Sequence, residues 1–149
     1  MPLLPPSTNA QYTGSLGAPH ALTLFAVLTI VPGCIHSFLP DGGAGTIAGI
    51  ALGPCGPSII ALFAWAGATQ IVFGLAMLSA ALRYRALVPL MLTLLLVERT
   101  LHALNGWLWK PGNGGHPPEH YAVLIALPCI AVALVASLRR ATSAPSGSR

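Results

Sequence analysis

Long apolar stretches dominate the chain, and short segments rich in glycine, proline or arginine separate them. A helix that rises 1.5 Å per residue needs roughly 20 apolar residues to cross a bilayer. Four stretches meet this length, at about residues 21–39, 58–82, 86–104 and 121–138. The pattern predicts an all-α protein, an integral membrane bundle of four antiparallel transmembrane helices.

Composition supports a membrane location. Hydrophobic residues make up 54% of the chain and charged residues 7%, whereas soluble domains carry about 25% charge. The net charge is +4, but the basic residues form no clustered face and are not interleaved with aromatic residues, which argues against nucleic acid as a partner. The lipid bilayer is the partner that the composition predicts.

The positions of the basic residues favour one orientation. An even number of spans places both termini on the same side of the membrane. On the side of the termini, five basic residues lie outside the spans: Arg83, Arg85, Arg139, Arg140 and Arg149. On the opposite side, the basic residue outside the spans is Lys110. Because cytoplasmic segments are enriched in lysine and arginine, we expect both termini in the cytoplasm of a multi-pass protein of a bacterial inner membrane.

The segments outside the spans divide the chain into three parts. Residues 1–20 are rich in proline, serine and threonine and lack the basic start of a secretory signal, so we expect a disordered cytoplasmic leader that packs against nothing. Residues 21–140 form the four-helix transmembrane domain, and residues 141–149 a disordered cytoplasmic tail. The apolar run at 46–52 is too short to span and predicts an interfacial or re-entrant turn.

The ionisable residues near the end of the third span have the highest free-energy cost of burial in a membrane of any residues in the chain. Glu98, Arg99 and His102 lie in a segment that otherwise reads as membrane-spanning, where each charge costs at least a few kcal/mol. Steps of four, three and four residues place Glu98, His102, Asn105 and Trp109 on one helical stripe. Arg99 lies about 100° away from Glu98, so it should not face Glu98 squarely and should reach another helix or the outer interface.

Two other spans carry polar residues at comparable depth. Gln70 offers an amide in the second span, where Gly67 and Gly74 would allow close helix approach. His36 lies a few residues from the outer end of the first span, and we expect it within hydrogen-bond or single-water reach of Glu98. The predicted ligand-binding residues are His36, Gln70, Glu98, Arg99, His102 and Asn105.

A metal site is a weaker interpretation of the same residues. Glu98 with His102, and His116 with His120, are each spaced i to i+4, which suits chelation from one helix face. The chain contains neither H-E-x-x-H nor a pair of E-x-x-H motifs, so we predict no metal and name no cofactor. In a purely structural interpretation, Glu98 pairs with Arg99, His36 or Gln70, and the two later histidines are solvated loop residues.

The cysteines give little support to thiol redox chemistry. Cys34, Cys55 and Cys129 form no C-x-x-C motif. We expect them to act as small packing residues.

Three segments resemble the DoxX-like group of small four-helix bacterial membrane proteins. They are Gly67-Ala-Thr-Gln70 with Phe73-Gly74, the turn Arg83-Tyr84-Arg85 followed by Leu87-Val88-Pro89-Leu90, and Glu98-Arg99. The resemblance covers the second and third spans and implies the four-helix architecture. Some members of the group are associated with quinone or thiol redox work, but without paired cysteines here only the architecture carries over.

The function that these residues favour is binding a small lipophilic or amphipathic molecule in a polar pocket in the outer half of the bundle. The protein would act alone or as an accessory subunit, and a membrane-protein partner or a second copy stays open. One alternative is a membrane enzyme that performs isomerase-type or redox-associated chemistry, with Glu98 and His102 as catalytic acid and base. A small proton-coupled transporter is disfavoured, because four short helices leave little room for alternating access.

Overall fold

The computed structural model describes residues 3–110 and 116–139, and the regular structure within these ranges is helical throughout. The long helices are α1 (Gly17–Phe38), α2 (Gly56–Leu82), α3 (Val88–Leu104) and α4 (Pro118–Leu138). Four short helical turns accompany them: η1 (Asn9–Gln11), η2 (Gly53–Cys55), η3 (Arg85–Leu87) and η4 (Asn105–Trp109). The predicted tail, residues 141–149, lies outside the described residues.

The prediction of four membrane-length helices is confirmed. Each of the four segments is long and apolar enough to cross a bilayer, where the second segment includes the turn η2 and the third includes η3 and η4. The first helix begins at Gly17, four residues before the predicted start. Helices α2, α3 and α4 each have a proline in their first two positions, where the fixed φ angle and the missing N–H suit a helix start.

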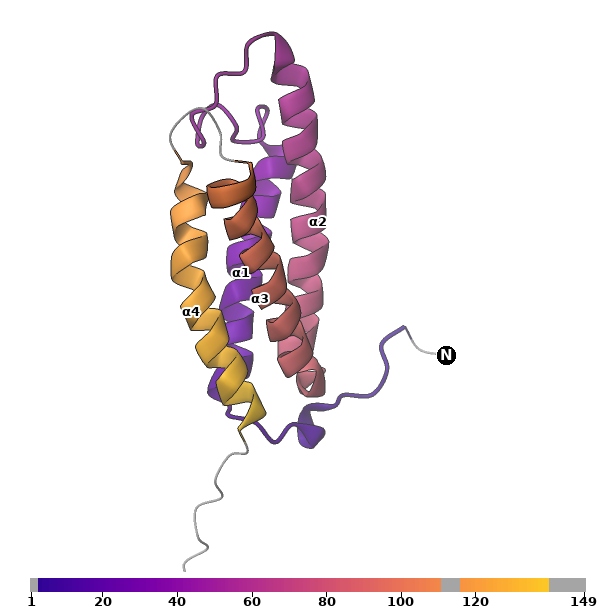
Figure 1. Cartoon of the computed structure of the whole chain (residues 1–149). Coiled ribbons are helices and arrows are strands. Elements are labelled where there is room, and N and C mark those ends of the chain that lie inside the picture. The colour runs from indigo at the N-terminus through magenta and orange to yellow at the C-terminus, as the bar shows by residue number, and fades with distance from the viewer. Residues whose placement is uncertain (1–2, 111–115, 140–149) are drawn as a thin grey trace, which may run out of the picture.

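The four helices lie side by side along a common axis (Figure 1). Helix α1 packs against α2 and α4, and α3 packs against α4. One end of the bundle carries the connection at residues 39–52 and the turn η4, and we call it the loop end. The other end carries η1, η3, Arg83 and Arg85, and we call it the arginine end.

Glycines allow α1 and α2 to approach closely. A Cβ atom added at Gly67 would lie 2.7 Å from the carbonyl oxygen of Gly33 and 2.7 Å from Oγ of Ser37. A Cβ atom at Gly74 would lie 3.1 Å from the carbonyl oxygen of Ala26. The close approach predicted from Gly67 and Gly74 is therefore confirmed, since no larger residue fits this seam.

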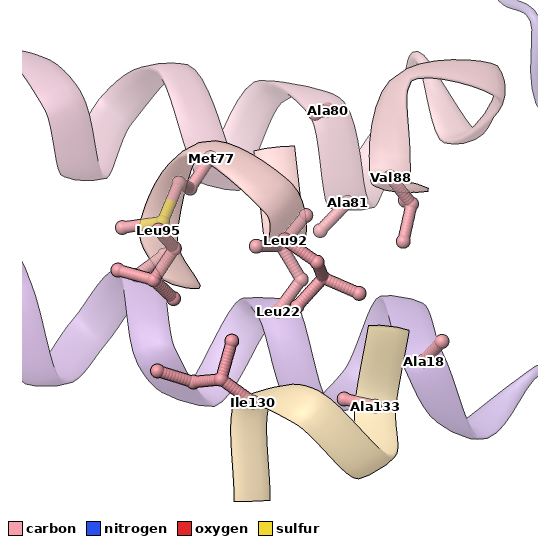
Figure 2. Packing of buried hydrophobic residues seen from close by; sticks show 11 residues of the cluster. Ala18, Leu22, Met77, Ala80, Ala81, Val88, Leu92, Leu95, Ile130 and Ala133 are labelled. Carbon is pink, nitrogen blue, oxygen red and sulfur yellow. The ribbon is translucent and has the colours of Figure 1, made fainter. Parts of the chain in front are cut away.

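The tightly packed core lies toward the arginine end. Figure 2 shows Leu22 from α1, Met77 from α2, Leu92 from α3 and Ile130 from α4 converging, and all four are fully buried. Large apolar side chains such as Val132, which is 70% exposed, cover the outside of the bundle, as expected for a surface facing lipid. Because the core fills the arginine end, open space in the bundle lies nearer the loop end.

The leader differs from the disordered segment that the sequence predicted. The Thr8 amide donates to the carbonyl oxygen of Arg83 at 3.1 Å, and Asn9 Nδ2 donates to that of Leu82 at 2.8 Å. Gly14 is buried against Tyr12 and Ser137. The last carbonyl groups of a helix have no partner within the helix, so the leader stabilises the end of α2 by supplying donors.

Asp41 organises the start of the connection between α1 and α2. Its carboxylate accepts hydrogen bonds from the amides of Gly43 (2.9 Å), Gly45 (3.1 Å) and Thr46 (2.8 Å). The Thr46 and Gly43 amides hold the pKa of the Asp41 carboxyl below its ordinary value. Gly42 and Gly43 have positive φ angles of 61° and 75°, a conformation that glycine adopts without strain. Asp41 therefore has a structural role at the loop end.

Candidate functional site

Arg99 joins two helices near the loop end. Its Nε atom lies 3.1 Å from Oε2 of Glu98, and its Nη2 atom donates to Oγ1 of Thr29 on α1 at 3.2 Å. The prediction that Arg99 reaches another helix is confirmed. The prediction that it cannot face Glu98 is wrong, because the long arginine side chain bends back across the 100° between neighbouring residues. Oε2 of Glu98 is buried and makes no well-aligned hydrogen bond within the described part of the chain.

His102 pairs with an acid on the next helix. Its Nε2 atom lies 3.6 Å from Oε1 of Glu119, which is in the first turn of α4. The sequence had suggested Glu98 as the acid that acts with His102, and Glu119 was not among its predicted site residues. Glu119 is thus a site residue that the sequence analysis missed.

A polar pocket of about 420 Å³ collects most of the predicted residues. Nine residues line it: His36, Leu62, Phe63, Ala66, Thr69, Gln70, Glu98, His102 and Glu119. Four of these were predicted ligand-binding residues. The structure therefore brings His36, Gln70, Glu98 and His102 to one pocket, from three different helices.

A second cavity of about 350 Å³ adjoins the polar pocket between α1, α3 and α4. Apolar residues make up most of its wall: Phe25, Leu28, Pro32, Leu95, Ala122, Val123 and Ala126. Thr29 and Arg99 add polar groups, and Gln70 and Glu119 line both this cavity and the polar pocket. Oε1 of Gln70 is buried and has no hydrogen-bond partner among the residues described. Polar groups therefore lie where this cavity adjoins the polar pocket.

His36 is held by the loop and not by Glu98. Its Nδ1 atom lies 2.7 Å from the carbonyl oxygen of Gly42, and its ring packs edge-on against Phe63. His36 and Glu98 share the polar pocket, but in residues 3–110 and 116–139 no hydrogen bond joins them. Each has a nearer partner, so the direct hydrogen bond that was one form of the predicted contact is not made, and reach through a single water molecule stays a prediction.

Asn105 does not join the other predicted ligand-binding residues. Its Nδ2 atom donates to the carbonyl oxygen of Leu101 at 2.9 Å, and it lines neither of the two cavities. Asn105 begins the π-helical turn η4, in which hydrogen bonds span five residues instead of four. The extra residue in this turn changes the helical spacing after Asn105, so the predicted stripe does not extend to Trp109.

Histidines and a tryptophan cluster at the loop end. Nδ1 of His116 lies 3.1 Å from Nδ1 of His120, and the ring of Trp107 stacks on His116 with 3.8 Å between centroids. Trp107 Nε1 donates to the carbonyl oxygen of His120 at 3.4 Å. Both histidines are partly buried, so the interpretation of His116 and His120 as solvated loop residues is wrong. The run His116-Pro-Pro-Glu-His120 at the start of the fourth span was the signal available in the sequence.

The site thus combines an apolar cavity, hydrogen-bonding groups at its polar end, and a histidine–carboxylate pair. Such a set can hold the polar part of a lipophilic molecule or transfer a proton to it. No protein-family model matches the chain, nor does any curated protein or solved structure.

Proposed function

We propose that the four helices cross a bacterial inner membrane as an antiparallel bundle, with the arginine end and both termini in the cytoplasm. The bias of basic residues supports this orientation. Exposed apolar side chains such as Ile125, which is 70% exposed, support contact with lipid along the outside of the helices. In this orientation the two cavities lie in the outer half of the membrane.

A fusion experiment tests the proposed orientation. A reporter that is active only in the cytoplasm should work when fused after Arg85 and fail when fused after Gly45, since these residues lie at opposite ends of the bundle. A reporter that is active only outside the cytoplasm is the control and should give the reverse result. Cytoplasmic activity after Gly45 would contradict the proposal.

We propose that the protein binds an amphipathic small molecule, with the apolar part in the cavity between α1, α3 and α4 and the polar part beside Gln70 and Arg99. The two spaces have volumes of about 350 and 420 Å³, within the roughly 300–1,000 Å³ typical of small-molecule sites. The adjoining apolar and polar walls match the two parts of such a molecule.

The side chains at the polar end define the chemistry of the head group. Arg99 has five N–H donors and uses only part of them on Thr29 and Glu98. Gln70 offers an amide, and Glu98 offers a carboxylate oxygen that accepts hydrogen bonds. A carbonyl, hydroxyl or carboxyl group on the ligand would suit this set.

The observation that carries the proposal is the buried oxygen Oε1 of Gln70, which has no hydrogen-bond partner in the described part of the chain, beside Oε2 of Glu98, whose near contact is the Arg99 guanidinium. A buried polar atom without a hydrogen bond costs about 1–3 kcal/mol. Both side chains line the polar pocket. A bound molecule with a hydroxyl or another donor group would supply the missing partner of Gln70 and could also donate to Glu98.

Native mass spectrometry of the protein extracted directly from the expressing membrane tests this function. We expect a bound lipophilic molecule on the parent protein and at least roughly tenfold less on Ala122→Phe, because the larger side chain would occupy space that the molecule fills and a loss of about 1.4 kcal/mol corresponds to tenfold in affinity. Val132→Phe is the matched control, since it enlarges an outward-facing residue of the same helix.

Gln70→Leu should also lower occupancy, because it removes the amide at the polar end. Two results would contradict the proposal. One is a parent protein without any bound molecule, and the other is equal occupancy of the Ala122→Phe and Val132→Phe proteins.

A second candidate function is proton-transfer chemistry on the same molecule. The observation in its favour is the contact between His102 and Glu119, 3.6 Å apart at the wall of the polar pocket. An enzyme would convert the molecule that it binds, so incubation of the extracted ligand with purified protein would change its structure or mass. A pure binding protein would release it unchanged.

A further inference from the structure

We infer a binding site for a divalent transition-metal ion of the zinc type at the loop end, formed by His102, Glu119 and His120. One donor atom from each of these residues lies within 4.8 Å of the other two. Two histidines and one carboxylate are a donor set that zinc prefers. The residues come from two helices, His102 from α3 and the other two from the first turn of α4.

The distances are close to those that a bound ion requires. Zinc binds nitrogen and oxygen at about 2.0–2.2 Å, so tetrahedral ligands lie roughly 3.3–3.5 Å from one another. Nε2 of His102 and Oε1 of Glu119 are already 3.6 Å apart. Small side-chain rotations at Glu119 and His120 would bring the third donor within range, because both side chains are near the start of α4 and only partly enclosed.

His120 is held by groups that do not belong to the proposed set of ligands. Its Nδ1 atom contacts His116, and Trp107 stacks on His116 and donates to the carbonyl oxygen of His120. A Cβ atom added at Gly106 would lie 2.7 Å from Cε1 and 2.9 Å from Nε2 of His120, so glycine at this position makes room for the ring. Metal-binding histidines commonly use their other ring nitrogen for such an orienting contact.

Three protein ligands leave the fourth position of a tetrahedral ion open. His102 and Glu119 both line the polar pocket, so an ion bound between them would lie at its wall and be reached from it. Zinc sites with three protein ligands and one open position bind water or a substrate atom there. The metal site needs no occupant in the neighbouring apolar cavity, so it stands independently of the proposed lipid-type ligand.

This donor set differs from the two pairs that the sequence suggested. Those pairs, Glu98 with His102 and His116 with His120, each lie along one segment of the chain. The structure takes one histidine from each pair and adds Glu119, while Glu98 contacts Arg99. Known sequence signatures are absent because the ligands are assembled across two helices.

Titration with Co²⁺ tests the site, because this ion replaces Zn²⁺ and its visible absorption reports coordination geometry. The protein should be purified in detergent without a polyhistidine tag and freed of metal by a chelator. We expect one Co²⁺ per chain, intense visible bands of a four-coordinate ion, and displacement of Co²⁺ by Zn²⁺. Glu119→Gln and His120→Ala should each weaken Co²⁺ binding by at least about 100-fold, and His116→Ala by about 10- to 100-fold.

His20→Ala is the matched control, since His20 is exposed in the first turn of α1 at the arginine end. Its Co²⁺ affinity should equal that of the parent. The parent titration alone overturns the inference if no four-coordinate spectrum appears, whether or not the variants fold. Equal affinities of the His20→Ala and His120→Ala proteins would also overturn it. Neither result depends on whether a lipophilic molecule is bound.

Discussion

Replacing Gly67 with alanine will lower the thermal stability of the bundle, although alanine is the better helix former by about 1 kcal/mol. The new Cβ atom would lie 2.7 Å from the carbonyl oxygen of Gly33, which is backbone, and 2.8 Å from Cβ of His36. Neither atom can move without separating α1 from α2. We expect a net loss of about 2 kcal/mol in unfolding free energy, within the usual range for overpacking, measured by unfolding in detergent.

Gly17→Ala is the control for this experiment. Gly17 also lies in a helix, but a Cβ atom there would find only Oγ of Ser15, at an ordinary distance of 3.6 Å. The stability of this variant should be unchanged or slightly higher. If Gly67→Ala and Gly17→Ala unfold at the same temperature, close contact between α1 and α2 is not needed for stability.

Replacing Arg99 with methionine will destabilise the protein by about 2–4 kcal/mol. The change leaves Oε2 of Glu98 buried beside no cation and removes the donor to Thr29. Breaking a buried ion pair from one side costs about 3–5 kcal/mol, and we expect slightly less because the Glu98 side chain is 44% exposed. The measurement is the free energy of unfolding in detergent.

Two double-mutant cycles separate the contributions of Arg99. Combined with Glu98→Gln, Arg99→Met should cost at least about 1 kcal/mol less than it does in the parent, since contacting residues typically couple by 0.5–3 kcal/mol. Combined with Thr29→Val, Arg99→Met should again cost less unfolding free energy than in the parent, but the difference should be smaller than with Glu98→Gln, because the contact with Thr29 is a single hydrogen bond. A coupling energy of zero with Glu98 would show that the ion pair does not stabilise the fold.

The sequence predicts best the features that depend on neighbouring residues. Hydropathy summed over about 20 positions is a local quantity, so the four membrane-length helices follow from it directly. Because Gly67 and Gly74 have no side chain beyond a hydrogen atom, they indicate close packing regardless of which helix is the neighbour. His36, Gln70, Glu98 and His102 could be selected as pocket residues because polar groups in apolar segments rarely face lipid.

The site residues that could not be predicted from the sequence come into contact only after the helices have packed. Glu119 and His120 lie more than fifteen positions from His102, and the contact of α3 with α4 decides which of their side chains meet. The sequence of the leader likewise does not indicate which backbone groups it contacts. Its hydrogen-bond donors contact the carbonyl oxygens of Leu82 and Arg83, which lie at the end of α2.

Local geometry also limits how far a helical stripe can be extended. Asn105 and Trp109 share a face on an ideal α-helix, but the helix changes to the π-turn η4 at Asn105, and the Lys110 amide donates to the Asn105 carbonyl oxygen five residues back. The sequence by itself thus determined the helices and the depth of their polar residues. Their rotation and partners, and with them the cavities and the proposed metal ligands, were decided by the tertiary structure, because packing minimises free energy over all four helices at once.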